Sequence, residues 1–358
     1  MSPVNQRVLA AVLATPLVVV LVVVALLRPL PYTTYSPGPT IDVLSSPDDK
    51  EIIQVGGGEK SYRDDGQLRM TTVSVSPRSA KLNLLQVMGS WLARGDAVYP
   101  YDSVYPDDKT PEQDKSEGQV QMLSSQDTAS AVALRALGYQ VPSYLEVQGI
   151  TTGGPADGAL DLRDLFVSVD GAKLPTGDLQ ESADQLTSAI KATPSGQQIQ
   201  LTVLRDGEEV TVPVTPEPDE NGDPRVGITF GEGFDLPFPI SVTIDPRIGG
   251  PSAGLMFSLG IYDTLTPGSL SDGGPVAGTG EIYSDGSVGP IGGIQQKIVG
   301  ARQAGAELFL VPADNCDDAE GARNGDMRLT RVATFDDARA AIEAWGEDHD
   351  ADLPTCGS

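Results

Sequence analysis

Ser252 has the surroundings that a serine nucleophile needs. It stands in the stretch Gly250-Pro251-Ser252-Ala253-Gly254, directly ahead of an apolar run that predicts a helix. Backbone N–H groups at the start of a helix point outward without partners, so they can stabilise an oxyanion beside such a hydroxyl. A serine nucleophile also needs a base that takes its proton. The base must therefore be sought elsewhere in the chain.

Histidine and zinc are poor candidates for activating this serine. The one histidine, His349, lies among four carboxylates in the C-terminal stretch GEDHDADLP. We expect this tail to be unstructured unless Cys356 holds it, so a catalytic imidazole is not expected there. One histidine and two cysteines are also too few for a hydrolytic zinc site. We therefore expect no metal and no other cofactor.

Lys297 is the remaining candidate base. The sequence predicts a helix in which Ile294, Lys297, Ile298 and Ala301 recur at intervals of three or four residues, on one face. Burial on such an apolar face lowers the pKa of a lysine, which lets the amine accept a proton near neutral pH. The alternative is a structural lysine whose alkyl chain covers the core while its charge reaches solvent.

Three short motifs in a fixed order resemble the proteolytic domain of the Lon family. They are GPSAG at residues 250–254, GTGEI at 278–282 and PIGGIQQK at 290–297. The serine and the lysine are 297 − 252 = 45 residues apart, which is close to the spacing in that family. The resemblance covers the C-terminal third of the chain and implies acyl transfer from a peptide bond to the serine.

The resemblance implies a role for each of these residues. Ser252 would be the nucleophile, Lys297 the general base, and Thr279 a hydrogen-bond partner that holds the lysine amine. Backbone N–H groups of Gly250, Ser252 and Ala253 would form the oxyanion hole. Gly250 departs from the ATP-dependent members, which often carry Asp there. This departure concerns substrate access rather than the serine–lysine pair.

A long apolar segment stands near the N-terminus. Val8–Leu27 has no charged residue and is long enough to cross a bilayer as a helix. A cleaved secretory signal is the alternative, but the segment is long for one and no A-x-A-like site follows it. Arg7 and Arg28 flank the segment almost symmetrically, so they do not determine its orientation. We predict an uncleaved single-pass anchor in the cell membrane.

Residues 140–217 differ from the rest in their pattern of short strands and glycine turns, and they resemble a PDZ domain of the kind found in bacterial proteases. The resemblance rests on Gly154-Pro155-Ala156, Asp164, Val169-Asp170-Gly171 and a following amphipathic helix. DLRD stands at residues 161–164, where the family usually has a Pro-Gly-Asp turn. A generic small α+β domain is the alternative. A hairpin is expected around Asp206-Gly207.

The combination of these segments resembles the membrane-anchored, PDZ-containing Lon-like proteases of bacteria. YSPGPTIDV, just after the apolar segment, is similar to a juxtamembrane signature of that family. No G-x-x-x-x-G-K-[ST] motif occurs in the sequence, so no phosphate-binding loop for ATP is expected. The resemblance implies an ATP-independent endopeptidase whose body is extracytoplasmic and whose partners are polypeptides. By analogy it also implies a ring of identical subunits.

The PDZ-like segment is predicted to interrupt the protease domain. A strand at Gln67–Pro77 and a helix with a Ser124-x-x-Asp127 capping pattern look like the first half of a Lon-type domain, yet they precede residue 140. We therefore predict an α+β fold with an insertion between about Tyr139 and Arg225. The segments are an anchor at 1–30, a first half at 31–139 with an acidic loop at 99–118, the PDZ-like insert at 140–217, a catalytic region at 225–346 and a tail at 347–358.

Charge and cysteine content narrow the partners. The net charge of −26 argues against nucleic acid and against a polybasic hold on anionic lipid. Cys316 and Cys356 could form a disulfide if the body lies outside the cytoplasm, or they could be two unrelated thiols. Two other functions stay open at this point: a membrane-anchored PDZ scaffold with an inactive Lon-like domain, and a hydrolase of non-peptide esters.

Overall fold

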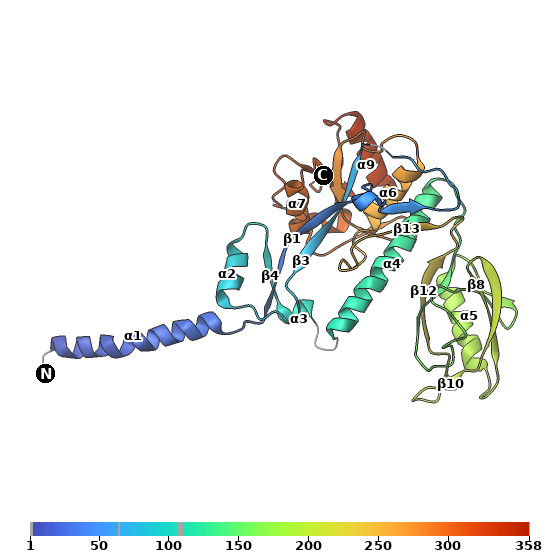
Figure 1. Cartoon of the computed structure of the whole chain (residues 1–358), viewed down its shortest axis with the longest axis horizontal. Helices are drawn as coiled ribbons and strands as arrows, with labels where there is room; N and C mark the ends of the chain where they lie inside the picture. Colours follow the sequence, from blue (N-terminus) through green and yellow to red (C-terminus); the bar gives the residue numbers. More distant parts are fainter. Residues whose placement is uncertain (1–2, 64, 106–109, 358) are drawn as a thin grey trace.

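The N-terminal apolar helix projects from a folded body. The computed structural model describes residues 3–63, 65–105 and 110–357. Helix α1 (Pro3–Leu27) contains the 20-residue apolar span Val8–Leu27, none of which is buried against the rest of the chain. Figure 1 shows α1 extending away from the body. A helix of this length and hydropathy can cross a membrane, although a signal sequence has the same properties.

A six-stranded mixed sheet forms the centre of the main body. Its strands, in spatial order β18-β17-β14-β3-β1-β4, come from both ends of the sequence. They are β1 (Tyr32–Asp42), β3 (Gln67–Val75), β4 (Ala97–Pro100), β14 (Pro275–Gly278), β17 (Leu308–Pro312) and β18 (Arg328–Val332). The β4-β1-β3 part is antiparallel, and β3, β14, β17 and β18 run parallel. The pairing of β3 with β14 joins the two halves of the sequence.

Helices cover both faces of this sheet. The helices α4 (Pro111–Ala136), α6 (Gly254–Leu265) and α9 (Phe335–Glu347) pack on one face, where Val276 and Leu310 are buried. The helices α7 (Ile294–Gln303) and α8 (Cys316–Ala319) pack on the other face, against Ala277 and Phe309. Successive side chains of a strand point to opposite faces, so the uninterrupted apolar runs of β14 and β17 supply both layers.

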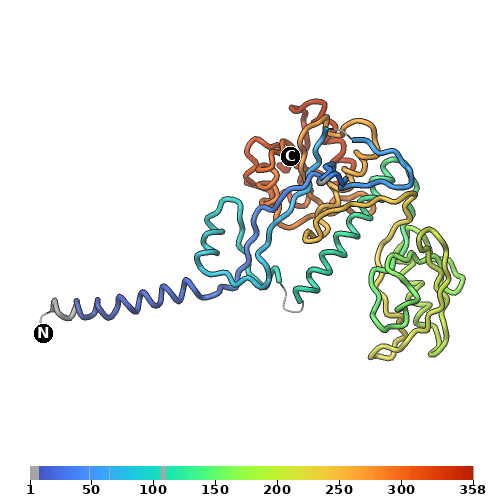
Figure 2. Tube along the Cα trace, viewed as in Figure 1, coloured from blue at the N-terminus to red at the C-terminus, as the bar shows by residue number. Residues whose placement is uncertain are grey.

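A second sheet lies apart from the first. It contains β5 (Ser143–Ile150), β6 (Leu165–Val169), β7 (Ala172–Lys173), β8 (Ile199–Arg205), β9 (Glu208–Val214) and β12 (Ile228–Phe234), and α5 (Leu179–Ala192) packs on it. The expected hairpin between β8 and β9 is present, with Asp206 and Gly207 at positive φ. Figure 2 shows this part of the trace as a separate lobe.

The C-terminal boundary of the second sheet differs from the sequence prediction. Residues from 225 onward were assigned to the catalytic region, but β12 pairs antiparallel with β5 from Ile228↔Ile150 to Phe234↔Ser143. The second sheet therefore extends to Phe234, because its first and last strands lie next to each other. The linker expected before it also contains structure, since β10 (Glu217–Pro218) and β11 (Pro224–Arg225) form a short hairpin.

Helix α4 is longer than the sequence predicts. The acidic stretch 99–118 was expected to be a loop, with a helix starting near Ser124 and Asp127. Instead α4 begins at Pro111, after Thr110 and Gln113 form a capping box. Ser124 and Asp127 are therefore inside the helix, where a Ser-x-x-Asp pattern caps nothing. Residues 106–109 of the predicted loop lie outside the described residues.

Short elements complete the main body. The helices α2 (Leu84–Leu92) and α3 (Tyr101–Val104) flank β4, and 3-10 turns lie at Pro47–Asp49 and Ala313–Asn315. Two small antiparallel pairs join β2 (Ile53–Val55) to β13 (Ile240–Val242) and β15 (Glu281–Ile282) to β16 (Val288–Gly289).

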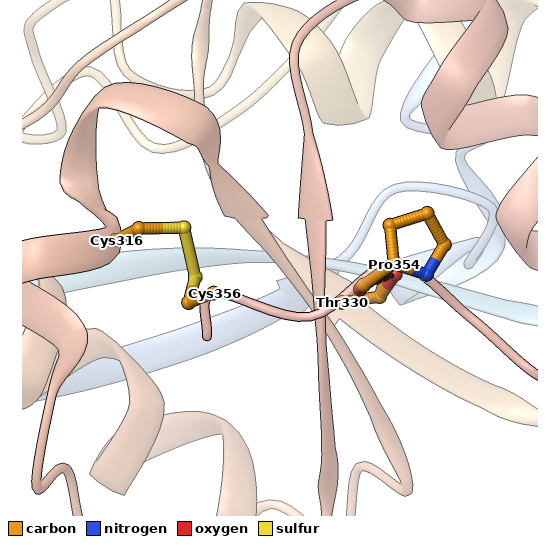
Figure 3. The surroundings of a disulfide bond; sticks show 4 residues. All are labelled: Cys316, Thr330, Pro354 and Cys356. Carbon is orange, nitrogen blue, oxygen red and sulfur yellow. Dashed lines mark hydrogen bonds between the residues drawn. A yellow bond between two sulfur atoms is a disulfide. The ribbon is translucent and has the colours of Figure 1, made fainter. Parts of the chain in front are cut away.

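The C-terminal tail is held against β18. Cys316 and Cys356 form a disulfide, with their Cα atoms 5.0 Å apart, and the carbonyl oxygen of Pro354 accepts a hydrogen bond from the Thr330 hydroxyl (Figure 3). The backbone N–H of Arg331 donates to the same oxygen at 2.9 Å. The structure therefore has the disulfide rather than two unrelated thiols, and the tail is ordered by it and by these hydrogen bonds.

Candidate active site

The loop that carries Ser252 is supported by helix α4. The Gly250 N–H donates to the Gly118 carbonyl oxygen at 2.9 Å, and the Ser125 hydroxyl donates to the Pro251 carbonyl oxygen at 3.0 Å. Gly250 has φ +92°, a left-handed conformation that favours glycine. Since these bonds fix the carbonyls and N–H groups around Ser252, the serine is presented by a rigid turn just before α6 begins at Gly254.

No motif in the sequence assigned Gly118 and Ser125 to the site. They are seven residues apart, so they lie on the same face of α4 two turns apart. The helix and the serine loop approach closely at Gly249, where a Cβ atom would lie 3.1 Å from the Gly118 carbonyl carbon. The glycine pair Gly249-Gly250 just before the serine is the signal that could have indicated a close approach of another element.

Lys297 reaches Ser252 from the opposite face of the sheet. It lies on α7, and its Nζ atom donates to Ser252 Oγ at 2.8 Å and to Thr279 Oγ1 at 2.8 Å. The side chain is 2% exposed, and Ile294, Ile298 and Ala301 are buried with it. The structure therefore contains a buried lysine rather than one whose charge reaches solvent.

Thr279 orients the lysine amine. It follows β14, is fully buried, and its hydroxyl donates to the Ser252 carbonyl oxygen at 2.9 Å. Because the hydroxyl proton is used in that bond, the Thr279 oxygen is left as an acceptor for Lys297 Nζ. Thr279 thereby links the backbone of the serine to the amine of the lysine.

The surroundings of Lys297 favour its neutral form. Burial lowers the pKa of this amine from 10.5 to about 7. Desolvation penalises the ammonium, and the two hydroxyl groups that contact Nζ carry no formal charge to offset it. A large fraction of the lysine is therefore neutral at physiological pH, with a lone pair available for a proton.

The backbone donors near Ser252 differ in availability. Among the residues that the structure describes, the N–H groups of Ser252 and Ala253 have no hydrogen-bond partner, and they precede helix α6. The expected contribution of Gly250 is wrong for this structure, because its N–H is bonded to Gly118. Gly250 instead shapes the turn, and two of the three predicted oxyanion donors stay free.

A cleft of about 550 Å³ opens beside Ser252 and Lys297. One wall is β3 from Met70 to Val75, and Met122, Ile248 and Ala253 contribute apolar surface. Strand β14 pairs with β3 only over Gln67–Met70, so within the described part of the chain β3 beyond Met70 has no strand neighbour on that side. The cleft thus combines an apolar lining with the edge of a sheet.

The other groups considered from the sequence lie elsewhere. His349 stacks on Trp345 of α9 with ring centroids 4.2 Å apart, and it takes no part in the cleft. In the described residues, no group of three or more His, Cys, Asp or Glu side chains could hold a metal ion.

The fold and the site together define a class of protein. A serine at a rigid turn, a buried lysine amine within hydrogen-bond distance, and free backbone N–H groups on an α+β scaffold are the parts used in serine–lysine hydrolysis.

Comparison with known proteins gives the family of this region. Residues 245–339 match the model of the Lon protease (S16) C-terminal proteolytic domain. Lon protease of Campylobacter concisus is 28% identical over 167 residues, which are 45% of this chain and 19% of that protein. Lon protease 1 of Sorangium cellulosum is 37% identical over 25% of this chain and 11% of that protein. Lon protease 2 of Bacillus subtilis is 40% identical over 22% and 13%.

This chain therefore contains a Lon-type proteolytic domain, and it spans a fifth or less of the length of these relatives. Solved structures of PDZ domains of SdrC-like proteins from Listeria monocytogenes and Listeria innocua are also similar. They are 19% and 18% identical, and the alignments cover 24% of this chain and 86% and 92% of those chains. The TM-score is 0.22 for both. A TM-score of 0.22 does not show that the second sheet has the fold of these domains.

Proposed function

We propose that this protein is an ATP-independent, membrane-tethered serine endopeptidase that hydrolyses polypeptides with Ser252 and Lys297. The observation that carries the proposal is the 2.8 Å contact between Lys297 Nζ and Ser252 Oγ inside the apolar surroundings of α7. A buried amine that contacts a serine hydroxyl and opens on a cleft has the geometry of a general base beside its nucleophile.

The first half of the reaction forms an acyl-enzyme. Neutral Lys297 accepts the hydroxyl proton of Ser252 while Oγ attacks the peptide carbonyl carbon. The resulting oxyanion accepts hydrogen bonds from the N–H groups of Ser252 and Ala253. Lys297, now an ammonium ion, gives its proton to the leaving amine, and the C–N bond breaks. Thr279 accepts a hydrogen bond from Nζ throughout and keeps the amine in place.

The second half releases the acid product. A water molecule gives a proton to Lys297 as its oxygen attacks the acyl carbon, and the proton then returns to Ser252 Oγ when the ester bond breaks. Each half therefore begins with a neutral lysine. Its lowered pKa supports this role, because an amine with an ordinary pKa would be almost entirely charged at neutral pH.

The cleft supports a polypeptide as the substrate. An extended segment can add to the free edge of β3 beyond Met70 and pass Ser252, with main-chain hydrogen bonds that do not depend on sequence. Apolar side chains would contact Met70, Met122 and Ile248. We expect a preference for unfolded or flexible segments of envelope proteins, because only these can adopt the extended form.

The second sheet is proposed to be a PDZ-like module inserted in the protease domain. The chain leaves the main body after α4 and returns after β12, whose last residue pairs with the first of β5. Insertion between close chain ends costs little, and two connections hold a module better than one. We propose that the module selects or admits substrate segments by strand addition.

The tether and the side of the membrane also belong to this proposal. The span Val8–Leu27 supports an uncleaved anchor, and the Cys316–Cys356 disulfide supports an extracytoplasmic body. Ser195 is exposed in the second lobe, so the Ser195→Cys variant should react with a membrane-impermeant maleimide in intact cells. Reaction only after lysis would contradict the extracytoplasmic location. Assembly into a ring stays a prediction.

Active-site labelling tests the enzyme proposal directly. Full-length protein in detergent should react with a fluorescent peptide phosphonate and should cleave a labelled unfolded polypeptide without nucleotide. Both activities should be lost in Ser252→Ala and Lys297→Met. Ser258→Ala is the matched control, since Ser258 is buried on α6 and donates within the helix.

The outcomes separate the alternatives. Labelling that survives in Ser252→Ala contradicts Ser252 as the nucleophile. A wild-type protein that neither labels nor cleaves favours a membrane-anchored scaffold with an inactive Lon-like domain. Cleavage of esters but not of peptides indicates a non-peptide hydrolase. Cleavage that requires added ATP contradicts only the proposal that the endopeptidase is ATP-independent.

A further inference from the structure

Helix α2 exposes an apolar face close to the end of the span. Leu85, Met88 and Leu92 recur at positions i, i+3 and i+7 and are 61%, 46% and 67% exposed, and Trp91 beside them is 74% exposed. No residue of α2 is buried. A helix with so much exposed apolar surface ordinarily has a partner that covers it.

The position of α2 is fixed relative to α1. The Leu30 N–H, three residues after the span, donates to the Leu82 carbonyl oxygen at 2.8 Å. Helix α2 packs on β1 and β4 and contacts α1, and Figure 1 shows it at the edge of the body nearest to α1. The apolar face is therefore held close to the level at which the span leaves the bilayer.

The charge of this region differs from that of the rest of the chain. The protein has 50 acidic residues, but none of them lies in residues 28–41 or 66–95, which together contain five basic residues. One of the five, Arg78, is paired with Asp114. Lys81 and Arg94, on either side of α2, and Arg28 at the end of the span are all exposed. Anionic lipid headgroups attract such a cluster, and the acidic remainder of the surface is repelled by them.

Aromatic side chains lie at the same level. Tyr32 and Tyr99 are each 39% exposed and come from β1 and β4, which pair next to the span exit. Tyrosine and tryptophan prefer the boundary between headgroups and acyl chains. Tyr32, Tyr99 and Trp91 are therefore of the residue types that make up an interfacial aromatic belt, and they lie around the end of α1.

We propose that the α2 face formed by Leu85, Met88, Trp91 and Leu92 inserts into the headgroup boundary of the same bilayer that α1 crosses, and so holds the body against the membrane surface. The inference rests on the proposed membrane tether. It commits the occupant of this face to lipid, because the face continues from the span and is bordered by basic residues.

This docking places one end of the cleft near the membrane. Strand β1 begins at Tyr32, and Tyr35, three residues further along, lines the cleft. At about 3.3 Å per residue, the cleft wall starts about 10 Å along the strand from the membrane-proximal end. Polypeptide segments close to the bilayer are then the substrates that the cleft meets first.

Quenching by brominated lipid tests the proposal. Full-length protein is reconstituted in vesicles of phosphatidylcholine and phosphatidylglycerol whose acyl chains are brominated close to the headgroup, since an interfacial helix lies about 5–10 Å deep. The chain has two tryptophans, and Trp345 is buried in the core. Most of the Trp91 emission should be lost, and Trp91→Phe should remove the quenched component.

Matched variants keep the test specific. Leu85→Glu combined with Leu92→Glu should abolish the quenching. Leu162→Glu should leave it unchanged, because Leu162 is equally exposed, at 61%, but lies in the second lobe. Quenching that persists in the double variant overturns the proposal.

Extraction by carbonate separates this inference from the tether. A protein that resists extraction but shows no quenching of Trp91 is tethered without α2 in the bilayer, so the inference fails and the tether stands. A protein that is extracted has no tether, and both proposals fail. Trp91 protected from brominated lipid, with Leu85→Cys cross-linking between chains, means that a second copy covers the face and also overturns the proposal.

Discussion

Two clusters in this molecule bury ionisable groups, and desolvation has a different consequence in each. At the Ser252 site, one amine is held by two hydroxyl groups, and burial lowers its pKa to about 7. In the junction cluster, defined as Asp127, Glu146 and Arg163, the guanidinium of Arg163 forms an ion pair with Asp127, and Glu146 lies close enough to feel both charges.

The junction cluster connects the main body to the second lobe. Asp127 lies on α4, Glu146 on β5, and Arg163 before β6, with Arg163 Nη2 2.8 Å from Asp127 Oδ1. Burial, and after it the charge of Asp127, raises the pKa of Glu146 to about 7. Arg163 stands in the DLRD stretch and has φ +73°, a left-handed conformation.

The difference lies in what remains when a proton moves. At the Ser252 site, Lys297 can lose its proton and leave only neutral hydrogen-bonded groups, so the deprotonated state has no buried charge to destabilise it. In the junction cluster, ionisation of Glu146 leaves two negative charges against one positive charge in partly buried surroundings. The first arrangement suits a general base. The second suits a contact between the main body and the second lobe whose stability depends on pH.

The largest expected effect is the loss of the base. Lys297→Met keeps the volume and apolar contacts of the side chain but removes the amine, so kcat/KM should fall by about 10²–10⁴-fold or more. Lys297→Arg should not restore activity, because a guanidinium keeps its proton. Thermal unfolding of Lys297→Met should show equal or higher stability, since a buried amine is costly. A destabilised Met variant would contradict the view that the lysine is retained for chemistry.

The pH profile should follow the ionisation of Lys297. Its pKa is lowered to about 7, and the active form is the neutral one present above that value. Values of kcat/KM should therefore rise about tenfold per pH unit well below pH 7 and level off above it, with a loss of about 50-fold from pH 7, where about half of the lysine is neutral, to pH 5. Rates measured from pH 5 to pH 9 on one substrate give this curve. A rate that falls as pH rises through 7 would refute the assignment.

Removal of the Thr279 hydroxyl should have a smaller effect. Thr279→Val deletes an acceptor for Lys297 Nζ, which costs about 1.5 kcal/mol, or about tenfold in kcat. Loss of this hydrogen bond destabilises the ammonium more than the neutral amine, so the pKa of Lys297 should fall and the rise of the pH–rate profile should move to lower pH. Thr279→Ser should restore both the rate and the position of this rise. An unchanged pH–rate profile in the Val variant would indicate a purely structural role.

The junction cluster should respond to pH in the opposite direction. The folded-state pKa of Glu146 is raised, so its ionisation costs stability as pH rises from about 4.5 through 7. Glu146→Gln should therefore be stabilising by about 1–2 kcal/mol at pH 8 and neutral at pH 4. Denaturant unfolding of both proteins at these pH values measures the difference, with the exposed Glu217→Gln as control. Equal effects at both pH values would remove the contrast between the two clusters.

Local patterns in the sequence determined much of what is seen. The apolar period around Lys297 placed the amine on a buried face, and Lys297 is buried in the structure. The length of Val8–Leu27, the alternation of β3 and the Asp206-Gly207 turn also predicted their elements. These features depend on neighbours a few residues apart, which is the range over which helix and strand periods act.

Only the tertiary structure decided the features that join distant residues. The Gly250 N–H donates to the Gly118 carbonyl oxygen, so it is not available for the oxyanion hole that the sequence predicted. The tertiary structure also paired β12 with β5 and placed Arg163 against Asp127. The net charge of −26 did not show that residues 66–95, which include α2, contain no acidic residue, because a sum over the chain does not show where charges gather.

The sequence by itself offered Ser252 and Lys297 as candidates for nucleophile and base, from their residue types, the apolar period around Lys297 and the order of three Lon-like motifs. Bringing Oγ and Nζ to 2.8 Å required β14, α6 and α7 to pack around one sheet. Distance between side chains on separate elements is a property of that packing, and no local pattern carries it.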